Sequence, residues 1–94
     1  ISLNEEDHFL DVGSGLGKLV FQLFLTTKIK SVTGIEIHKP RHDIAIQVKN
    51  KLCDQFPAFF KEGRSLNFIA GDFLKANLEN ITILYVCSTV FSFE

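Results

Sequence analysis

The stretch Phe9-Leu10-Asp11-Val12-Gly13-Ser14-Gly15-Leu16-Gly17 decides the fold of this 94-residue chain. It is a short apolar run that ends in three glycines at alternate positions, and an apolar pattern of helical spacing follows it. Glycine lets the backbone bend sharply and approach a ligand with no Cβ in the way. The stretch therefore predicts a strand, a tight turn and the N-terminus of a helix, whose free N–H groups can face a ligand.

Strand and helix signals alternate along the rest of the chain. Apolar and β-branched runs predict strands at 8–12, 31–37, 66–70 and 81–87. Apolar residues at helical spacing predict a helix at 16–25 and a second from Pro40 to Pro57, with a core stripe of Ala45, Val48, Leu52 and Phe56. Residues 74–80 are expected to form a short helical link. This alternation predicts right-handed crossovers and an α/β, Rossmann-like, doubly wound parallel sheet, of which about four strands are present.

Length and composition limit what the chain can be. Ninety-four residues build one domain with one core, and a chain that begins with Ile1 and stops on phenylalanines is expected to be a fragment of a longer protein. The net charge of -1 gives no electrostatic footprint for nucleic acid, and no apolar run is long enough to span a bilayer. The two cysteines match no metal-ligand spacing, so we expect no metal and a cytoplasmic location.

The glycine turn discriminates between nucleotide-like ligands. A dinucleotide fingerprint needs a third glycine where this chain has Lys18, which argues against a nicotinamide oxidoreductase. Asp11, two residues before the first glycine, would repel a pyrophosphate, but it can face a cationic methionyl group. The pattern therefore favours S-adenosyl-L-methionine as the cofactor.

Two further acidic residues follow predicted strands. Glu36 stands at the end of the second strand, where a carboxylate can accept hydrogen bonds from both ribose hydroxyls. Asp72 follows the third strand and could take the adenine amino group while Phe73 packs on the base. Because ligands of open parallel sheets bind at the carboxyl ends of the strands, the three acids are expected to share one site.

With these residues in place, the chain resembles the class I methyltransferases, and among them the disruptor-of-telomeric-silencing type, the non-SET histone-lysine methyltransferases. The resembling segments are 9–17 running into 20–22, then 34–36, 71–74 and 83–91 with Glu94. The resemblance implies an S-adenosylmethionine-binding core over 1–94, with a lysine-containing protein as substrate and a nuclear location if the source is eukaryotic. The implied cofactor-binding residues are Asp11, Gly13, Ser14, Gly15, Gly17, Glu36, Asp72 and Phe73.

One segment departs from the family pattern. Eukaryotic members carry an asparagine pair and an aromatic residue where this chain has Cys87, Ser88 and Thr89. The resemblance places this segment beside the transferred methyl group, so Ser88 and Thr89, which offer hydroxyl groups, are the candidate catalytic residues. The departure also supports an alternative hypothesis, in which the chain is a non-catalytic methyltransferase-like binding module.

Overall fold

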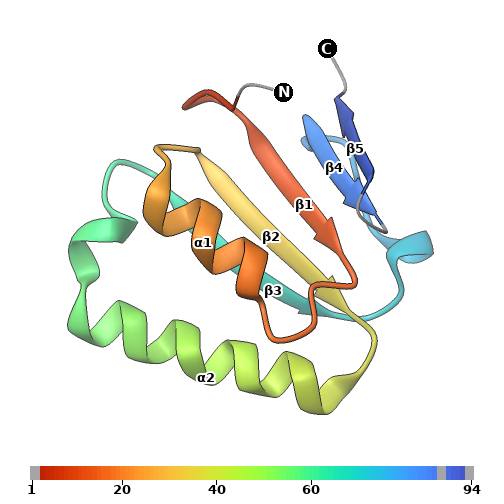
Figure 1. Ribbon diagram of the computed structural model, residues 1–94, viewed down its shortest axis with the longest axis horizontal. Coiled ribbons are helices and arrows are strands. Elements are labelled where there is room, and N and C mark those ends of the chain that lie inside the picture. Colours follow the sequence, from red (N-terminus) through yellow and green to blue (C-terminus); the bar gives the residue numbers. More distant parts are fainter. Residues whose placement is uncertain (1–2, 87–88, 93–94) are drawn as a thin grey trace.

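The chain folds around one five-stranded sheet with the strand order β3-β2-β1-β4-β5. The computed structural model describes residues 3–86 and 89–92. Its strands are β1 (His8–Val12), β2 (Ser31–Glu36), β3 (Ser65–Ala70), β4 (Ile83–Val86) and β5 (Thr89–Ser92). The first four run parallel to one another, whereas β5 pairs antiparallel with β4 (Figure 1). The α/β, Rossmann-like sheet predicted from the sequence is therefore confirmed.

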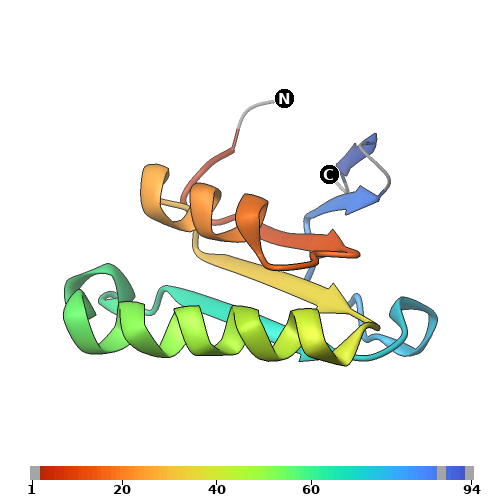
Figure 2. The same cartoon turned by 60° about the horizontal axis from the view of Figure 1, so that its bottom comes forward.

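Both helices cover the same face of the sheet (Figures 1 and 2). The chain passes from β1 through α1 (Lys18–Thr26) to β2, and from β2 through α2 (Lys39–Gln55) to β3. Because both steps move in the same direction along the sheet and crossovers are right-handed, the two helices must lie on one side. The described residues thus form one half of a doubly wound fold, the half whose crossover helices lie on one face of the sheet.

The core consists of two apolar clusters, one on each face of the sheet. The cluster on the helix face contains Phe9, Val20, Phe24, Ile29, Val32, Leu66 and Ile83. On the other face, Leu10, Ile35 and Leu84 are covered by apolar residues from the segment that joins β3 to β4. Alternate residues of β1 serve the two clusters, as expected of a strand buried on both faces.

The segment between β3 and β4 differs from its prediction. The helix expected at 74–80 is wrong, because the structure has only a single 3₁₀ turn there, η2 (Phe73–Lys75). Asp72 begins this turn by accepting a hydrogen bond from the N–H of Leu74 at 2.9 Å. After it the backbone becomes extended at Ala76, and Phe73, Ala76, Leu78 and Ile81 pack against the sheet. Packing of these side chains overrides the weak helical propensity of so short a segment.

Two other expectations are corrected. Of the predicted core stripe in and after α2, Ala45 is buried and Leu52 packs against the helix-face core, as predicted. Val48 and Phe56, the other two members, are 45% and 54% exposed, so this half of the stripe is wrong. The less exposed positions of α2 are His42, Asp43, Ala45, Ile46, Lys49, Leu52 and Cys53, and most of them recur at the spacing of one helix face. The predicted strand at 81–87 is shorter, and β5, which was not predicted, follows it.

Candidate cofactor site

The predicted cofactor-binding residues lie at one edge of the sheet, where the parallel strands end. Asp11 and the glycine loop (13–17) come from the end of β1, Glu36 is the last residue of β2, and Asp72 follows β3. Since β1, β2 and β3 are neighbours in the sheet, their carboxyl ends stand side by side (Figure 1). The structure therefore brings together the three acidic residues that the sequence singled out.

The glycine loop is attached to the neighbouring strand by its backbone. The N–H groups of Gly13 and Ser14 both donate to the carbonyl oxygen of Ile35 on β2, at 2.8 and 3.0 Å. Gly13, Gly15 and Gly17 all have positive φ angles, of 76°, 59° and 86°. Other residues rarely adopt such angles, so the loop needs glycine at these three positions.

Glu36 joins two loops through its carboxylate. One oxygen accepts a hydrogen bond from the N–H of Gly15 at 2.7 Å, and the other accepts one from the N–H of His38 at 2.9 Å. The His38 N–H, and after it that of Gly15, hold the pKa of Glu36 below its usual value, although burial acts in the opposite direction. A carboxylate has about four lone-pair positions, so each oxygen can still accept one more hydrogen bond.

Asp11 is a buried carboxylate that lacks a hydrogen-bond partner among the described residues. It is 5% exposed, and burial, with a smaller contribution from the charge of Glu36, raises its pKa to about 6. Burying a charged group is unfavourable unless it is paired. Because Asp11 lines a cavity at this edge, a ligand can bring a cation or a hydrogen-bond donor to its carboxylate.

Two adjoining cavities lie along this edge. The first, of about 490 Å³, is lined by Asp11, Val12, Gly13, Ser14, Lys18, Leu19 and Tyr85. The second, of about 200 Å³, is lined by Val12, Gly13, Ile35, Glu36, Ile37, Gly71, Asp72 and Phe73. The two cavities share Val12 and Gly13, so they adjoin at the start of the glycine loop, and we refer to them together as the elongated site.

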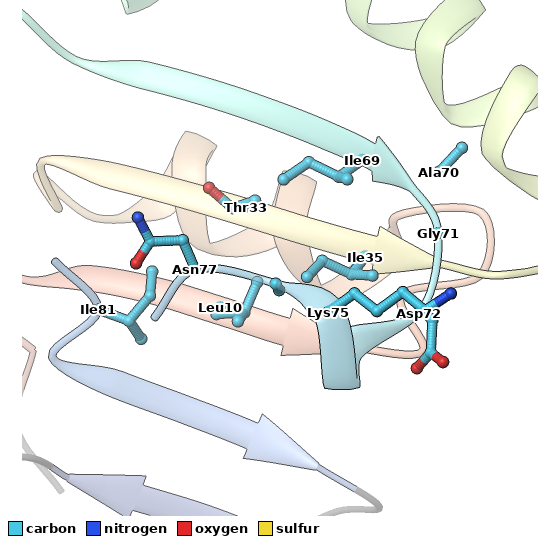
Figure 3. Close-up of a pocket in the computed structure, with 11 residues that line it drawn as sticks. Leu10, Thr33, Ile35, Ile69, Ala70, Gly71, Asp72, Lys75, Asn77 and Ile81 are labelled. Carbon is cyan, nitrogen blue, oxygen red and sulfur yellow. The ribbon is translucent and has the colours of Figure 1, made fainter. Parts of the chain in front are cut away.

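A third cavity, of about 550 Å³, lies on the sheet face opposite the helices (Figure 3). Its floor is apolar, with Leu10, Ile35 and Ile69 pointing into it, and Asp72 and Lys75 stand at one end. Asp72 also lines the second cavity, which places its carboxylate on the boundary between the edge of the sheet and this face. Phe73 is partly buried and packs against the second-face core, so its position is fixed.

Several residues that line the site were not assigned a role from the sequence, among them Lys18, Tyr85 and Ile37. Lys18 lines the first cavity together with Asp11, and its position directly after the last glycine was a usable signal. Tyr85 reaches the same cavity because it stands opposite Asp11 in the sheet register, a pairing that a single sequence does not disclose. Ile37, 74% exposed beside Glu36, lines the second cavity.

The candidate catalytic residues are only partly placed. Ser88 lies outside the described residues, and for Thr89 the structure describes the backbone alone, at the start of β5 opposite Val86. In the described parts of the chain, no three His, Cys, Asp or Glu residues gather where they could hold a metal ion. The described helices include none that is long and apolar enough to cross a membrane.

Comparison with known proteins places this geometry in a family. A search of curated protein sequences found no match. Among solved structures, the chain is similar to an RNA methyltransferase from Salinibacter ruber in complex with S-adenosyl-L-homocysteine, with 25% sequence identity and a TM-score of 0.67. The match covers 89% of this chain and 50% of that one, so the chain spans about half the length of its structural neighbour.

The neighbour confirms the class I methyltransferase fold predicted from the sequence, and its bound ligand is of the cofactor class that the glycine turn predicted. A third comparison, with models of protein families, matches nearly the whole chain. The family model described as "Histone methylation protein DOT1" covers residues 1–93. This chain therefore belongs to the DOT1 histone methylation family.

Proposed function

We propose that residues 1–94 are the S-adenosylmethionine-binding core of a methyltransferase that transfers a methyl group to lysine in a protein substrate. The observation that carries this proposal is the unpaired, buried carboxylate of Asp11 in a cavity that adjoins the site of Glu36 and Asp72. A cofactor with a cationic end and a nucleoside end fits this arrangement of charges.

The elongated site offers a place for each part of the cofactor. Asp11 would pair with the methionyl ammonium group, and Lys18, in the same cavity, would pair with the methionyl carboxylate. Glu36 keeps a free acceptor position on each oxygen for the two ribose hydroxyls. Asp72 would accept from the adenine amino group, with Phe73 and Ile37 packing beside the base.

The glycine loop has a structural part in this binding. Gly13 and Ser14 donate their N–H groups to the carbonyl oxygen of Ile35 and so hold the loop to β2, and a Cβ atom on Gly13 would point into open space. Gly13 and Ser14, which line the first cavity, would lie against the methionyl end of the cofactor, and Gly15 and Gly17 would support the loop through their positive φ angles. A side chain at Gly13 would stand where the ligand must lie.

Methyl transfer needs positioning more than covalent help from the protein. The bound cofactor supplies a sulfonium-linked methyl group, which an acceptor nitrogen attacks in line with the departing sulfur. A lysine acceptor must first lose its proton, and removal from water in a narrow channel lowers the pKa of an amine. Ser88 and Thr89, after β4, would offer hydroxyl groups to orient that amine.

The family supports a histone as the protein substrate. Such a substrate would place the protein in the nucleus of a eukaryote, and we place it in the cytoplasm otherwise. RNA is the second candidate acceptor, because the structural neighbour is an RNA methyltransferase. The net charge of -1 and the absence of a basic tract favour the protein substrate over RNA.

The test uses full-length protein and S-adenosylmethionine with a radioactive methyl group. We expect label to enter histones or nucleosomes, but not RNA, and to be lost with Asp11→Ala or Gly13→Val. Calorimetry with the same variants measures cofactor binding separately. Tight cofactor binding with no label on any acceptor would favour the non-catalytic binding module, and unchanged affinity in both variants would refute the cofactor site.

A further inference from the structure

One row of side chains crosses four strands on the helix face, directly under the candidate cofactor site. In the sheet register, Asp11 lies between Tyr85 and Gly34, and Gly34 lies opposite Phe68. Three members of this row carry side chains and the fourth carries none. Gly34 therefore leaves a gap in the row, between the carboxylate of Asp11 and the ring of Phe68.

The gap is occupied by the glycine loop. A Cβ atom placed on Gly34 would lie 2.6 Å from both Cβ and Oγ of Ser14, and 3.1 Å from a ring carbon of Phe68. The Cβ of Ser14 is attached to the loop backbone, so it cannot turn aside as the tip of a long side chain can. Any side chain at position 34 must therefore lift the loop away from β2.

A second contact supports the loop a few residues further on. A Cβ atom on Gly17 would meet the ring of Phe68 at 2.7 Å and that of Phe21 at 3.0 Å. The two rings pack together with their centroids 5.1 Å apart. Phe68 thus touches the loop at its end and borders the gap at Gly34, where Ser14 lies.

Ser14 is held in this gap by shape and not by its hydroxyl group. It is 8% exposed, and its Oγ atom has no hydrogen-bond partner among the described residues. Its backbone N–H donates to Ile35, the residue after Gly34. The loop is therefore fixed by two backbone hydrogen bonds and by the close fit of Ser14 over Gly34.

We propose that Gly34 and Phe68 are positioning residues that set the height of the glycine loop, and through it the affinity for the cofactor. We call this pair the loop seat. Neither residue lines the two cavities of the candidate site, so the loop seat acts through Ser14 and Gly17. The proposal rests on the proposed function, because it assumes that the loop binds S-adenosylmethionine.

The experiment measures S-adenosylmethionine affinity by calorimetry in full-length protein. We expect Gly34→Ala to weaken binding at least tenfold, and to raise the KM for the cofactor while kcat at saturating cofactor is kept. Gly63→Ala is the matched control: it also replaces a glycine, but its new Cβ would meet only the mobile end of Lys30. We expect it to leave cofactor affinity within about twofold of the wild type, whatever it does to stability.

A second variant separates loop position from general damage. Ser14→Gly removes the two atoms that collide with a Cβ at position 34. The remaining neighbour, a ring carbon of Phe68 at 3.1 Å, needs to move by only a few tenths of an ångström. In a Ser14→Gly background, Gly34→Ala should therefore leave the affinity within about threefold of Ser14→Gly alone. If Gly34→Ala alone fails to fold, recovery of folding and binding in the double variant supports the loop seat.

Two results would overturn the proposal. Wild-type affinity in Gly34→Ala would show that the loop tolerates a side chain beneath it. An equal loss in both backgrounds, or a double variant that still fails to fold, would show that the effect does not run through Ser14. The proposed function fails in a different way, since wild-type protein would then show no binding of S-adenosylmethionine at all.

Discussion

Asp11 and Glu36 end neighbouring strands at the same edge of the sheet, and their protonation equilibria are shifted in opposite directions. Both are buried, at 5% and 7% exposure. Glu36 is held ionised by two backbone N–H groups, whereas burial and the nearby charge of Glu36 raise the pKa of Asp11 to about 6. The protein itself thus provides hydrogen-bond donors for Glu36, whereas the carboxylate of Asp11 remains available to a ligand.

Replacing Asp11 by asparagine should change the stability of the ligand-free protein and its affinity for S-adenosylmethionine in opposite directions. Between the usual pKa of 3.8 and its value of about 6, Asp11 makes the folded state bind more protons than the unfolded one, so stability falls as the pH rises through this range. At pH 8, Asp11→Asn should therefore raise the free energy of unfolding of ligand-free protein by about 1–3 kcal/mol. Chemical denaturation at pH 8 measures this gain.

The same variant should lose affinity for S-adenosylmethionine by about 10- to 100-fold, because hydrogen bonds to charged groups contribute roughly 1.5–3 kcal/mol. Asp54→Asn, at an exposed carboxylate near the end of α2, is the control and should change neither quantity. A variant that is destabilised and still binds normally would contradict the assignment of Asp11 to the cofactor.

Cofactor binding should weaken in mild acid. Binding of an ammonium group requires ionised Asp11, and at pH 5 only about one protein in ten would carry that form if the pKa is about 6. We expect the dissociation constant to be constant above pH 7 and to rise about tenfold for each pH unit below 6. Glu36 stays ionised in this range because its pKa is lowered. A flat profile between pH 5 and 7 would be inconsistent with this role.

Glu36→Gln tests the junction between the two loops. An amide has one acceptor oxygen, so its NH₂ group would face the N–H of either Gly15 or His38. A buried N–H left without a partner costs about 1–3 kcal/mol. We expect a loss of stability of that size together with weaker cofactor binding, measured by thermal unfolding and calorimetry. Glu62→Gln, at an exposed position far from the site, should match the wild type in both measurements.

Arg64 should be a determinant of stability alone. Its guanidinium donates to the carbonyl oxygens of Phe24, Thr27, Ile29 and Phe59, at 2.8–3.2 Å, and lies 4.2 Å from the centre of the Phe24 ring. Lysine lacks the planar fork that reaches four acceptors at once. We expect Arg64→Lys to lower the free energy of unfolding by about 1–3 kcal/mol, because several of these partly buried hydrogen bonds would be lost.

Cofactor affinity should not change in Arg64→Lys at temperatures where the variant remains folded, because Arg64 lies at the amino end of β3, away from the site. Lys61→Ala, at an exposed neighbouring position, is the control for stability. If Arg64→Lys weakened the cofactor complex as strongly as it weakened the fold, the two ends of the sheet would have to be coupled.

The strands and the three acids were predictable because their signals are local. A run of apolar residues followed by glycine or an acid indicates a strand end, and the strand ends of a parallel sheet share one edge. The buried side of α2 was only partly predictable: Ala45 and Leu52 lie on it as predicted, but Val48, which is equally apolar, is exposed because packing against β2 and β3 sets the rotation of the helix. The same holds for 74–80, where tertiary contacts replace the expected helix.

The parts of the site that escaped prediction depend on register. Tyr85 reaches Asp11, and Gly34 lies beneath Ser14, because of pairings between strands that are far apart in sequence. A glycine inside a strand was visible in the sequence as an anomaly, but its neighbour was not. Lys18 carried a signal of its own, at the first turn of α1, and it was used only to exclude a different cofactor.

Arg64 separates the part of this domain that stabilises the fold from the part that would bind ligands. The guanidinium holds the end of α1, the turn before β3 and the start of β3 together at the amino ends of the strands, whereas every candidate ligand contact lies at the carboxyl ends. Substitutions that adapt the domain to a new acceptor therefore fall at one end of the sheet, whereas the hydrogen bonds of Arg64 that stabilise the fold lie at the other end. Substitutions at the carboxyl ends of the strands should therefore alter acceptor specificity at little cost to stability, while a substitution at Arg64 should lower stability whatever the acceptor is.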